Sequence, residues 1–155
     1  MFKIICEEND KELVLDTFLK EFTNMCICGI SVDIDKLEEE QVNGAKEMIS
    51  MECIEEYEDI DGGFEIEFLC PNEIGFLLLN LFDMGNTYVD SFTSNYACMK
   101  NVIEKLVEKV PNVVVEGSIE YDDGISCISE NISMIEGKII SKWDDEEDDI
   151  YEDDV

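Results

Sequence analysis

The chain has 155 residues, of which 40 are acidic and 10 are basic, so its formal net charge is −30. Every basic residue is Lys, because the sequence has no Arg and no His. This composition argues against direct binding to DNA, RNA or an anionic membrane, because few cations are available to neutralise phosphates. It also excludes catalysis that depends on His, and bidentate recognition of phosphate or carboxylate by Arg.

The length and apolar content fit a single globular domain. A chain of 155 residues with 45% apolar residues can bury a core without disulfides or bound metal. Its seven Cys are odd in number and mostly lie among apolar residues, which favours free, buried thiols in a cytoplasmic protein. The acidic start does not resemble a signal peptide, and no apolar run is long enough to span a membrane, so we expect no membrane partner.

The periodicity of the apolar residues divides the chain into strands and helices. In chain order the predicted elements are a strand at 2–6, a helix at 9–22, a strand at 27–34, a helix at 35–49, an edge strand or loop at 51–61, a strand at 64–70, a helix at 71–84, a helix at 94–110, and strands at 113–121, 125–132 and 136–143. Capping-box patterns at Asn9–Glu12 and at Asp35 with Glu38 support the first two helices. Gly62–Gly63 predicts the turn before the strictly alternating strand at 64–70.

Two further helices are predicted between residues 71 and 110. The helix predicted from Pro71 is apolar on all sides, which is typical of a helix at the centre of a core, and Gly85 is its predicted end. The helix from about Ser94 has the most regular apolar spacing, and Pro111 ends it. Asp122–Gly124 is a hairpin signal between the strands on either side of it.

This order of elements predicts one two-layer α+β domain over residues 1–143, with an antiparallel sheet of about five strands and helices packed on one face. Residues 144–155 contain nine acids and are predicted to form a disordered tail. The run 94–143, with its helix, Pro111–Asn112, an apolar strand, Glu120–Gly124 and two more strands, resembles the ferredoxin-like domains of small phage and plasmid proteins. This resemblance implies a ferredoxin-like fold and a mobile-element setting, and it carries no catalytic motif.

The acidity belongs to the body of the chain as well as to the tail. Without the nine acids of residues 144–155, residues 1–143 still have a net charge of −21. Residues 47–99 contain twelve acids and no Lys, so we expect one strongly negative face. Carboxylates at positions i and i+2 of a strand lie about 6.6 Å apart. This is close to the interval of about 6–7 Å between successive phosphates of a nucleic-acid strand. The predicted partner-binding residues are Glu52, Glu55, Glu56, Glu58, Asp59, Asp61, Glu65 and Glu67, followed by Glu116, Glu120 and the acids of the tail.

Metal binding has only fragmentary support. Asp33–Asp35 and Asp59–Gly62 start like calcium loops, but an EF-hand from Asp59 needs Gly at position 64 and Glu at position 70, where Phe64 and Cys70 stand. Cys26–Cys28 is the only close pair of cysteines, and its spacing is not typical of a zinc site. The sequence therefore predicts neither a dedicated metal site nor a cofactor.

One pattern suggests an enzyme. Glu136–Lys138, together with Asp123, resembles the metal site of the restriction-endonuclease-like family. In that family, acids hold Mg²⁺ and the Lys assists the attacking water, so the resemblance implies a nuclease. A net charge of −30 would repel the substrate of a nuclease. Nucleotide-binding and nucleophile-elbow motifs are absent, and the Cys and Ser residues have no His to activate them.

The sequence therefore predicts a non-enzymatic binding protein without catalytic residues. Its acidic face is expected to occupy the groove of a basic nucleic-acid-binding protein or nuclease, as anti-restriction, anti-CRISPR and nuclease immunity proteins do. The first alternative is a regulatory or structural module that contacts its partner through an apolar patch, with acidity serving solubility. The second alternative is the magnesium-dependent nuclease. A halophilic origin would also explain the charge, and no oligomeric state follows from the sequence.

Overall fold

The structure, a computed structural model, describes residues 1–84, 98–122 and 127–145. Within these ranges the chain forms six strands, four α-helices and two short 3₁₀ helices. The strands are β1 (Phe2–Ile5), β2 (Ile54–Ile60), β3 (Gly63–Phe68), β4 (Val114–Asp122), β5 (Cys127–Ile135) and β6 (Lys138–Asp145). The helices are η1 (Glu8–Asp10), α1 (Lys11–Gly29), η2 (Ile34–Lys36), α2 (Glu39–Glu52), α3 (Pro71–Leu81) and α4 (Met99–Lys109).

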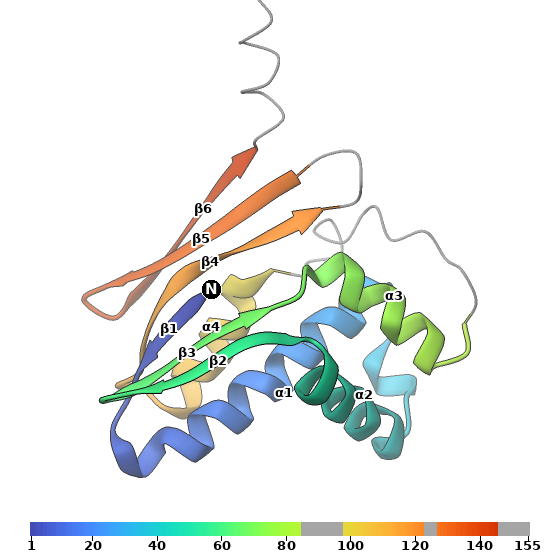
Figure 1. Cartoon of the computed structure of the whole chain (residues 1–155), viewed down its shortest axis with the longest axis horizontal. Helices are drawn as coiled ribbons and strands as arrows, with labels where there is room; N and C mark the ends of the chain where they lie inside the picture. Colours follow the sequence, from blue (N-terminus) through green and yellow to red (C-terminus); the bar gives the residue numbers. More distant parts are fainter. Residues whose placement is uncertain (85–97, 123–126, 146–155) are drawn as a thin grey trace, which may run out of the picture.

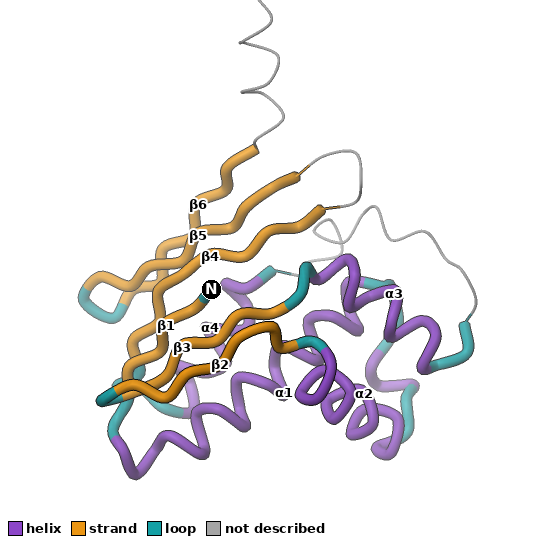
Figure 2. Tube along the Cα trace, in the orientation of Figure 1, coloured by secondary structure: helices purple, strands orange, loops and turns teal. Residues whose placement is uncertain are grey.

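All six strands belong to one antiparallel sheet in the order β2-β3-β1-β4-β5-β6 (Figure 1). β1 lies between β3 and β4, which are far from it in the sequence. The four α-helices lie on one side of this sheet, so strands and helices form two layers (Figure 2). The predicted α+β class is therefore confirmed, with six strands in place of about five.

Alternation of side chains along the strands creates the core between the two layers. Phe2 on β1 and Phe68 on β3 point toward the helices and are buried. Phe18 of α1 packs edge-on against Phe2, with ring centroids 6.1 Å apart, and Phe22 stacks on Phe68 at 3.9 Å. Because large aromatic rings bury much apolar area, this cluster holds α1, the longest helix of the described chain, against the middle of the sheet.

A fully buried carboxylate fixes α4 on the sheet. Glu130, on β5, is 0% exposed and accepts four hydrogen bonds. Its Oε1 accepts from the Met99 N–H (2.7 Å) and the Tyr121 hydroxyl (2.9 Å), and its Oε2 from the Lys100 N–H (3.0 Å) and the Ser141 hydroxyl (3.1 Å). Met99 and Lys100 are the first two residues of α4, whose N–H groups have no acceptor within the helix. The carboxylate of Glu130 on β5 thus caps the N-terminus of α4.

The strand predicted at 27–34 is wrong, because α1 continues through Gly29. Cys26 and Ile27 are both fully buried and extend the apolar face of this helix, so its packing continues past the predicted end. The chain then turns at Ser31, which has a positive φ of 62°. Alternation over so few apolar residues does not separate a strand from the last turn of a buried helix.

The predicted capping patterns are also corrected. α1 starts after the 3₁₀ turn η1, and its N-cap Asp10 makes no side-chain capping bond. The capping box of α2 pairs Glu38 with Gln41 rather than Asp35 with Glu38. Asp35 lies in η2, where its N–H donates to the side chain of Asp33. Acidic residues at several neighbouring positions offer competing caps, and the local turn decides between them.

Helix α3 is less central than its apolar sequence predicts. Ile74 is fully buried, but Phe76 and Leu81 are 46% and 47% exposed. The prediction of a helix buried on all sides is therefore wrong: α3 lies at one end of the helical layer and packs by one face (Figure 1). The predicted helix end at Gly85 and helix start near Ser94 lie outside the described residues.

The last three strands form a meander. β5 and β6 are joined by a tight turn in which Glu136 and Gly137 both have positive φ, 51° and 79°, as a two-residue hairpin turn requires. β6 continues to Asp145, two residues into the predicted tail, and residues 146–155 lie outside the described residues. β4 and β5 are paired as predicted. Of the predicted turn Asp122–Gly124, only Asp122 lies within the described residues.

Candidate partner-binding face

Four glutamates form two directly opposed pairs on the sheet face turned away from the helices. The pairing of β2 with β3 places Glu56 opposite Glu67 and Glu58 opposite Glu65. We call these four residues the glutamate quartet. Glu56 and Glu58 are exposed, and Glu65 and Glu67 are half-buried. Directly opposed residues of an antiparallel pair have Cβ atoms about 4.5–5.5 Å apart, so the carboxylates are crowded.

This arrangement is electrostatically unfavourable for the isolated fold. Like charges directly opposite each other destabilise a sheet, whereas opposite charges contribute about 0.2–1 kcal/mol. The cation nearest in register is Lys3 on β1, which lies opposite Glu65 on one side and Glu116 on the other. Among the described residues, the ion pairs within 4.0 Å involve Lys11, Lys46 and Lys105, and none includes the quartet. The quartet therefore presents concentrated negative charge to solvent.

Three further predicted residues lie on or beside the same face. Glu116 and Glu120 are exposed on β4, beyond β1. Glu55 lies at an irregularity in β2, between the paired residues Ile54 and Glu56, and it lines a cavity with Glu67. Seven of the ten predicted acids thus gather on one side of the sheet.

The other three predicted acids lie elsewhere in the structure. Glu52 is the last residue of α2, and Asp61 lies in the turn between β2 and β3. Asp59 lies opposite the buried Phe64, so it points toward the helical side of the sheet. Successive side chains of a strand point to opposite faces of the sheet. Glu58 therefore lies on the face turned away from the helices, and Asp59 on the face toward them.

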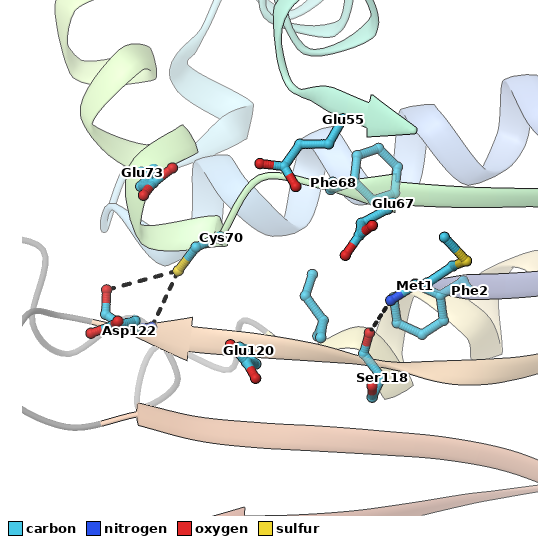
Figure 3. Close-up of a pocket in the computed structure, with 11 residues that line it drawn as sticks. Met1, Phe2, Glu55, Glu67, Phe68, Cys70, Glu73, Ser118, Glu120 and Asp122 are labelled. Atoms are coloured by element: carbon cyan, nitrogen blue, oxygen red, sulfur yellow. Dashed lines mark hydrogen bonds between the residues drawn. The ribbon is translucent and has the colours of Figure 1, made fainter. Parts of the chain in front are cut away.

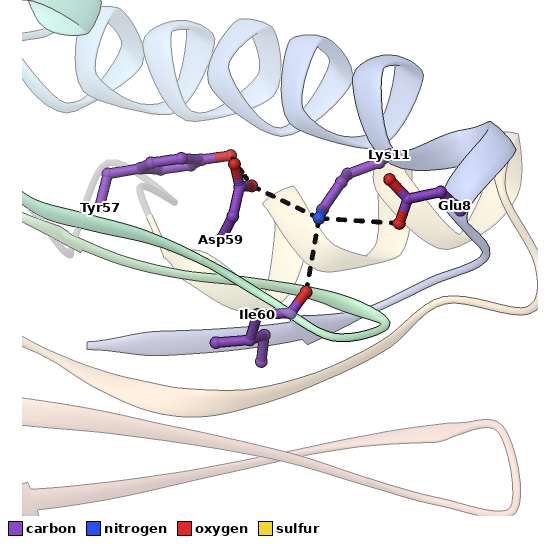
Figure 4. Close-up of polar contacts among 5 residues, drawn as sticks. All are labelled: Glu8, Lys11, Tyr57, Asp59 and Ile60. Carbon is purple, nitrogen blue, oxygen red and sulfur yellow. Dashed lines mark hydrogen bonds and ion pairs between the residues drawn. The ribbon is translucent and has the colours of Figure 1, made fainter.

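Asp59 has a structural role at the edge of the helical layer (Figure 4). It accepts a hydrogen bond from the Tyr57 hydroxyl at 2.9 Å and pairs with Lys11 at 3.4 Å. Lys11 also contacts Glu8 (3.8 Å) and donates to the carbonyl of Ile60 (3.4 Å), which ties the start of α1 to β2. Burial, with a further contribution from Asp59, raises the pKa of Tyr57 to about 12. Asp59 is thus engaged within the protein.

A cavity of about 550 Å³ opens between β3 and β4, next to the quartet. Figure 3 shows Glu55, Glu67 and Glu73 on its β3 side and Glu120 and Asp122 on its β4 side. Glu73 and Asp122 were not among the predicted site residues. Glu73 lies in the first turn of α3 and Asp122 at the end of β4, so only the fold brings them to this cavity.

The residues of the nuclease hypothesis are not assembled by the described part of the chain. Glu136 lies in the turn between β5 and β6, Lys138 is the first residue of β6, and Asp123 lies outside the described residues. In residues 1–84, 98–122 and 127–145, no three Cys, Asp or Glu side chains are grouped so that they could hold a metal ion. The seven cysteines form no disulfide; Cys26 is buried and Cys28 exposed, two residues apart on α1.

No protein-family model, curated protein or solved structure matches this chain. No described helix combines the length and the apolar character needed to cross a membrane.

Proposed function

We propose that the protein is a non-enzymatic binding protein whose acidic sheet face contacts a basic nucleic-acid-binding surface of a partner protein. The observation that carries this proposal is the glutamate quartet, two directly opposed pairs of like charge on a face that the helices leave open. A plain soluble domain gains nothing from this crowding, since it destabilises the sheet. A cationic partner would relieve the repulsion and gain from it on binding.

The spacing of the quartet supports imitation of a phosphate backbone. Glu65 and Glu67 are two residues apart on β3, about 6.6 Å. Glu56 and Glu58 repeat this interval on the neighbouring strand, about 4.8 Å away. Successive phosphates of one nucleic-acid strand are separated by a similar distance, about 6–7 Å. A groove lined with Lys and Arg that binds phosphates can therefore meet carboxylates at corresponding positions.

The order of the first four strands supports the ferredoxin-like part of the proposal. β1 is followed by helices, β2 and β3 form a hairpin, and helices precede β4, with β1 inserted between β3 and β4. This is the split β-α-β arrangement of ferredoxin-like domains. β5 and β6 then extend the sheet beyond β4. On this strand order we propose a ferredoxin-like fold for the domain.

A second candidate function, a module that binds through an apolar patch, is favoured by one observation. Phe76 in the middle of α3, Leu81 at its end and Met84 just after it are 46%, 47% and 49% exposed. Exposed apolar surface can mark a protein-binding site. A partner held there would be insensitive to salt, whereas a partner of the quartet would be sensitive to it.

Competition with nucleic acid tests the proposal. The full chain is immobilised and exposed to a nuclease-treated cell lysate enriched for basic proteins on heparin, at low and at moderate salt. The expected result is a retained protein that elutes as salt rises and that duplex DNA or RNA displaces from the immobilised chain. Retention that neither salt nor nucleic acid reduces would contradict the proposal and favour the apolar patch.

A further inference from the structure

Strand β2 forms one edge of the sheet. Within the described residues it pairs with β3 on one side and with no strand on the other (Figure 1). Its residues Glu55–Asp59 are all exposed, although their side chains alternate between the two faces of the sheet. No described helix therefore covers this edge. An open edge strand presents unpaired N–H and C=O groups to which another strand can bind.

The pairing register identifies the backbone groups that face this open edge. Alternate residues of an antiparallel strand direct their N–H and C=O groups to the same neighbour. The Cys6 N–H donates to the Gly62 carbonyl, so the even-numbered residues of β3 bond to β1 and the odd-numbered residues bond to β2. Glu58 lies opposite an odd-numbered residue and therefore bonds to β3. Its neighbours Tyr57 and Asp59 direct their backbone groups outward, where the described chain has no strand to pair with them.

The side chains give this edge two different faces. Glu56 and Glu58 belong to the quartet and point away from the helices, whereas Tyr57 and Asp59 point toward the helical side. Asp59 is already paired with Lys11, and the ring of Tyr57 is 43% exposed (Figure 4). A strand added at this edge would therefore meet two carboxylates that form no ion pair among the described residues on one face, and an aromatic ring and a completed ion pair on the other.

These charges favour a basic occupant and disfavour a second copy of this chain. In a strand bonded to the outward groups of β2, the residues opposite Glu56 and Glu58 form non-hydrogen-bonded pairs, whose side chains lie closest together. Lys or Arg at these two positions would place opposite charges side by side. Two antiparallel copies of β2 would instead set glutamates against glutamates. Main-chain hydrogen bonds would hold the added backbone and the carboxylates would select its sequence, as in other cases of strand addition.

We propose that the edge of β2 receives an extended basic segment of the partner, which pairs antiparallel with Glu56–Ile60 and carries Lys or Arg at every second position. The proposal rests on the proposed function only in taking the partner as basic; the open edge is an independent observation. It assigns the main-chain hydrogen bonds to Tyr57 and Asp59 and the charge contacts to Glu56 and Glu58. Antiparallel pairing continues the arrangement of the whole sheet and is the more stable one per residue.

The test uses the full chain and the fluorescent peptide acetyl-Lys-Val-Lys-Val-Lys-amide. In the proposed register its two Val residues lie opposite Tyr57 and Asp59, so their N–H groups donate to β2 and those of the Lys residues point away. One control peptide is N-methylated on both Val residues and the other on two of the Lys residues, and all three peptides have the same charge. We expect methylation of Val to weaken binding at least tenfold and methylation of Lys to change it by less than about twofold.

Hydrogen exchange and a charge variant locate the bound peptide. At saturation the unmodified peptide should slow exchange of the Tyr57 and Asp59 amides more than that of the Glu58 amide, which already bonds to β3. A Glu56→Gln/Glu58→Gln variant should bind the peptide more weakly, because the two carboxylates nearest to its Lys side chains lose their charge.

A matched pair of variants tests one outward N–H group. Tyr57→Pro removes this donor, and Tyr57→Ala loses the same ring but keeps the donor. Proline is accepted in an edge strand where its nitrogen faces solvent, so the pairing of β2 with β3 should survive. Tyr57→Pro should bind the peptide at least tenfold more weakly than Tyr57→Ala. If Tyr57→Pro does not fold, the methylated peptides and the exchange of the unmodified chain decide the question.

Three outcomes would overturn pairing at this edge. Equal binding of the three peptides, or unchanged exchange at Tyr57 and Asp59, would do so but leave the proposed function standing, because binding by charge alone would remain. Binding of none of the peptides would also do so, and the salt-dependent capture of a basic protein would judge the proposed function separately. Exchange at Tyr57 and Asp59 that slows with protein concentration alone would show that a second copy of this chain, and not a basic segment, occupies the edge.

Discussion

Replacing Glu130 is the most informative perturbation of the fold. Glu130→Ala removes the acceptor of four hydrogen bonds, two of them from the first N–H groups of α4. A hydrogen bond to a charged group contributes about 1.5–3 kcal/mol, and a buried donor left without a partner costs about 1–3 kcal/mol. These terms do not add fully, because Ser141 is half-buried and its hydroxyl can turn to water. We expect a loss of about 3–5 kcal/mol in the free energy of unfolding, because several buried donors lose their acceptor at once.

A graded series sharpens this prediction. Glu130→Gln keeps one oxygen acceptor but turns an amide donor toward another donor, so we expect a loss of about 1–3 kcal/mol. Tyr121→Phe removes one of the four donors and should cost about 1 kcal/mol. Glu120→Gln, an exposed position on the neighbouring strand, is the matched control and should stay within about 0.5 kcal/mol. Urea unfolding followed by circular dichroism measures all four variants, and a loss below about 1 kcal/mol for Glu130→Ala would refute the reasoning.

Three further predictions concern backbone contacts and thiols. A Cβ at Gly117 would collide with the Met1 carbonyl, and the backbone of Gly117 has a positive φ of 154°. Gly117→Ala should therefore lower the free energy of unfolding by at least about 1–3 kcal/mol. The control Gly44→Ala, in open space on α2, should raise it by about 0.5–1 kcal/mol, and thermal unfolding compares the two variants. Burial raises the pKa of Cys53 from 9.0 to about 11 and that of Cys26 well above 9.0. Because the folded state holds these thiols protonated, their contribution to stability is complete below pH 9 and falls as pH rises toward 11. Urea unfolding midpoints at pH 8, 10 and 11 should decrease in that order, and a constant midpoint would contradict the prediction. In native protein at pH 8, mass spectrometry should find Cys28, which is exposed, alkylated before buried Cys26 and Cys53; simultaneous modification would contradict the burial pattern.

The sequence predicts the elements whose local pattern has a single interpretation. Phe64, Ile66 and Phe68 alternate strictly with polar residues, and all three are buried on β3 as predicted. Residues 27–34 show a weaker pattern that fits both a strand and the end of a buried helix, and the packing of α1 decides for the helix. For the helix from Pro71, apolar composition alone does not reveal that one face lies at the margin of the helical layer.

The candidate site shows the same division between local and long-range information. Alternation predicts that Glu65 and Glu67 share a face, and the short turn at Gly62 then sets them opposite Glu58 and Glu56. The same alternation directs Asp59 to the other side of the sheet, opposite Phe64, so it does not share the face of Glu58. The cavity next to the quartet could not be predicted, because it depends on β1 pairing with β3 and β4, which are far from it in the sequence. No local pattern encodes those contacts.

The central claim, that the acidic sheet face binds a basic partner, is tested most directly by the affinity of Glu65→Lys/Glu67→Lys for the captured partner. The change replaces both opposed like-charged pairs between β2 and β3 by opposite-charged ones, but it also sets a like charge opposite Lys3. These effects oppose each other, so the free energy of unfolding should change by less than about 1 kcal/mol. Affinity should fall by at least about thirtyfold, or 2 kcal/mol. The control Glu104→Lys/Glu108→Lys makes the same change of net charge on exposed positions of α4, in the helical layer, and should keep most of the affinity. A folded Glu65→Lys/Glu67→Lys protein that binds as tightly as the unmodified chain would contradict the account.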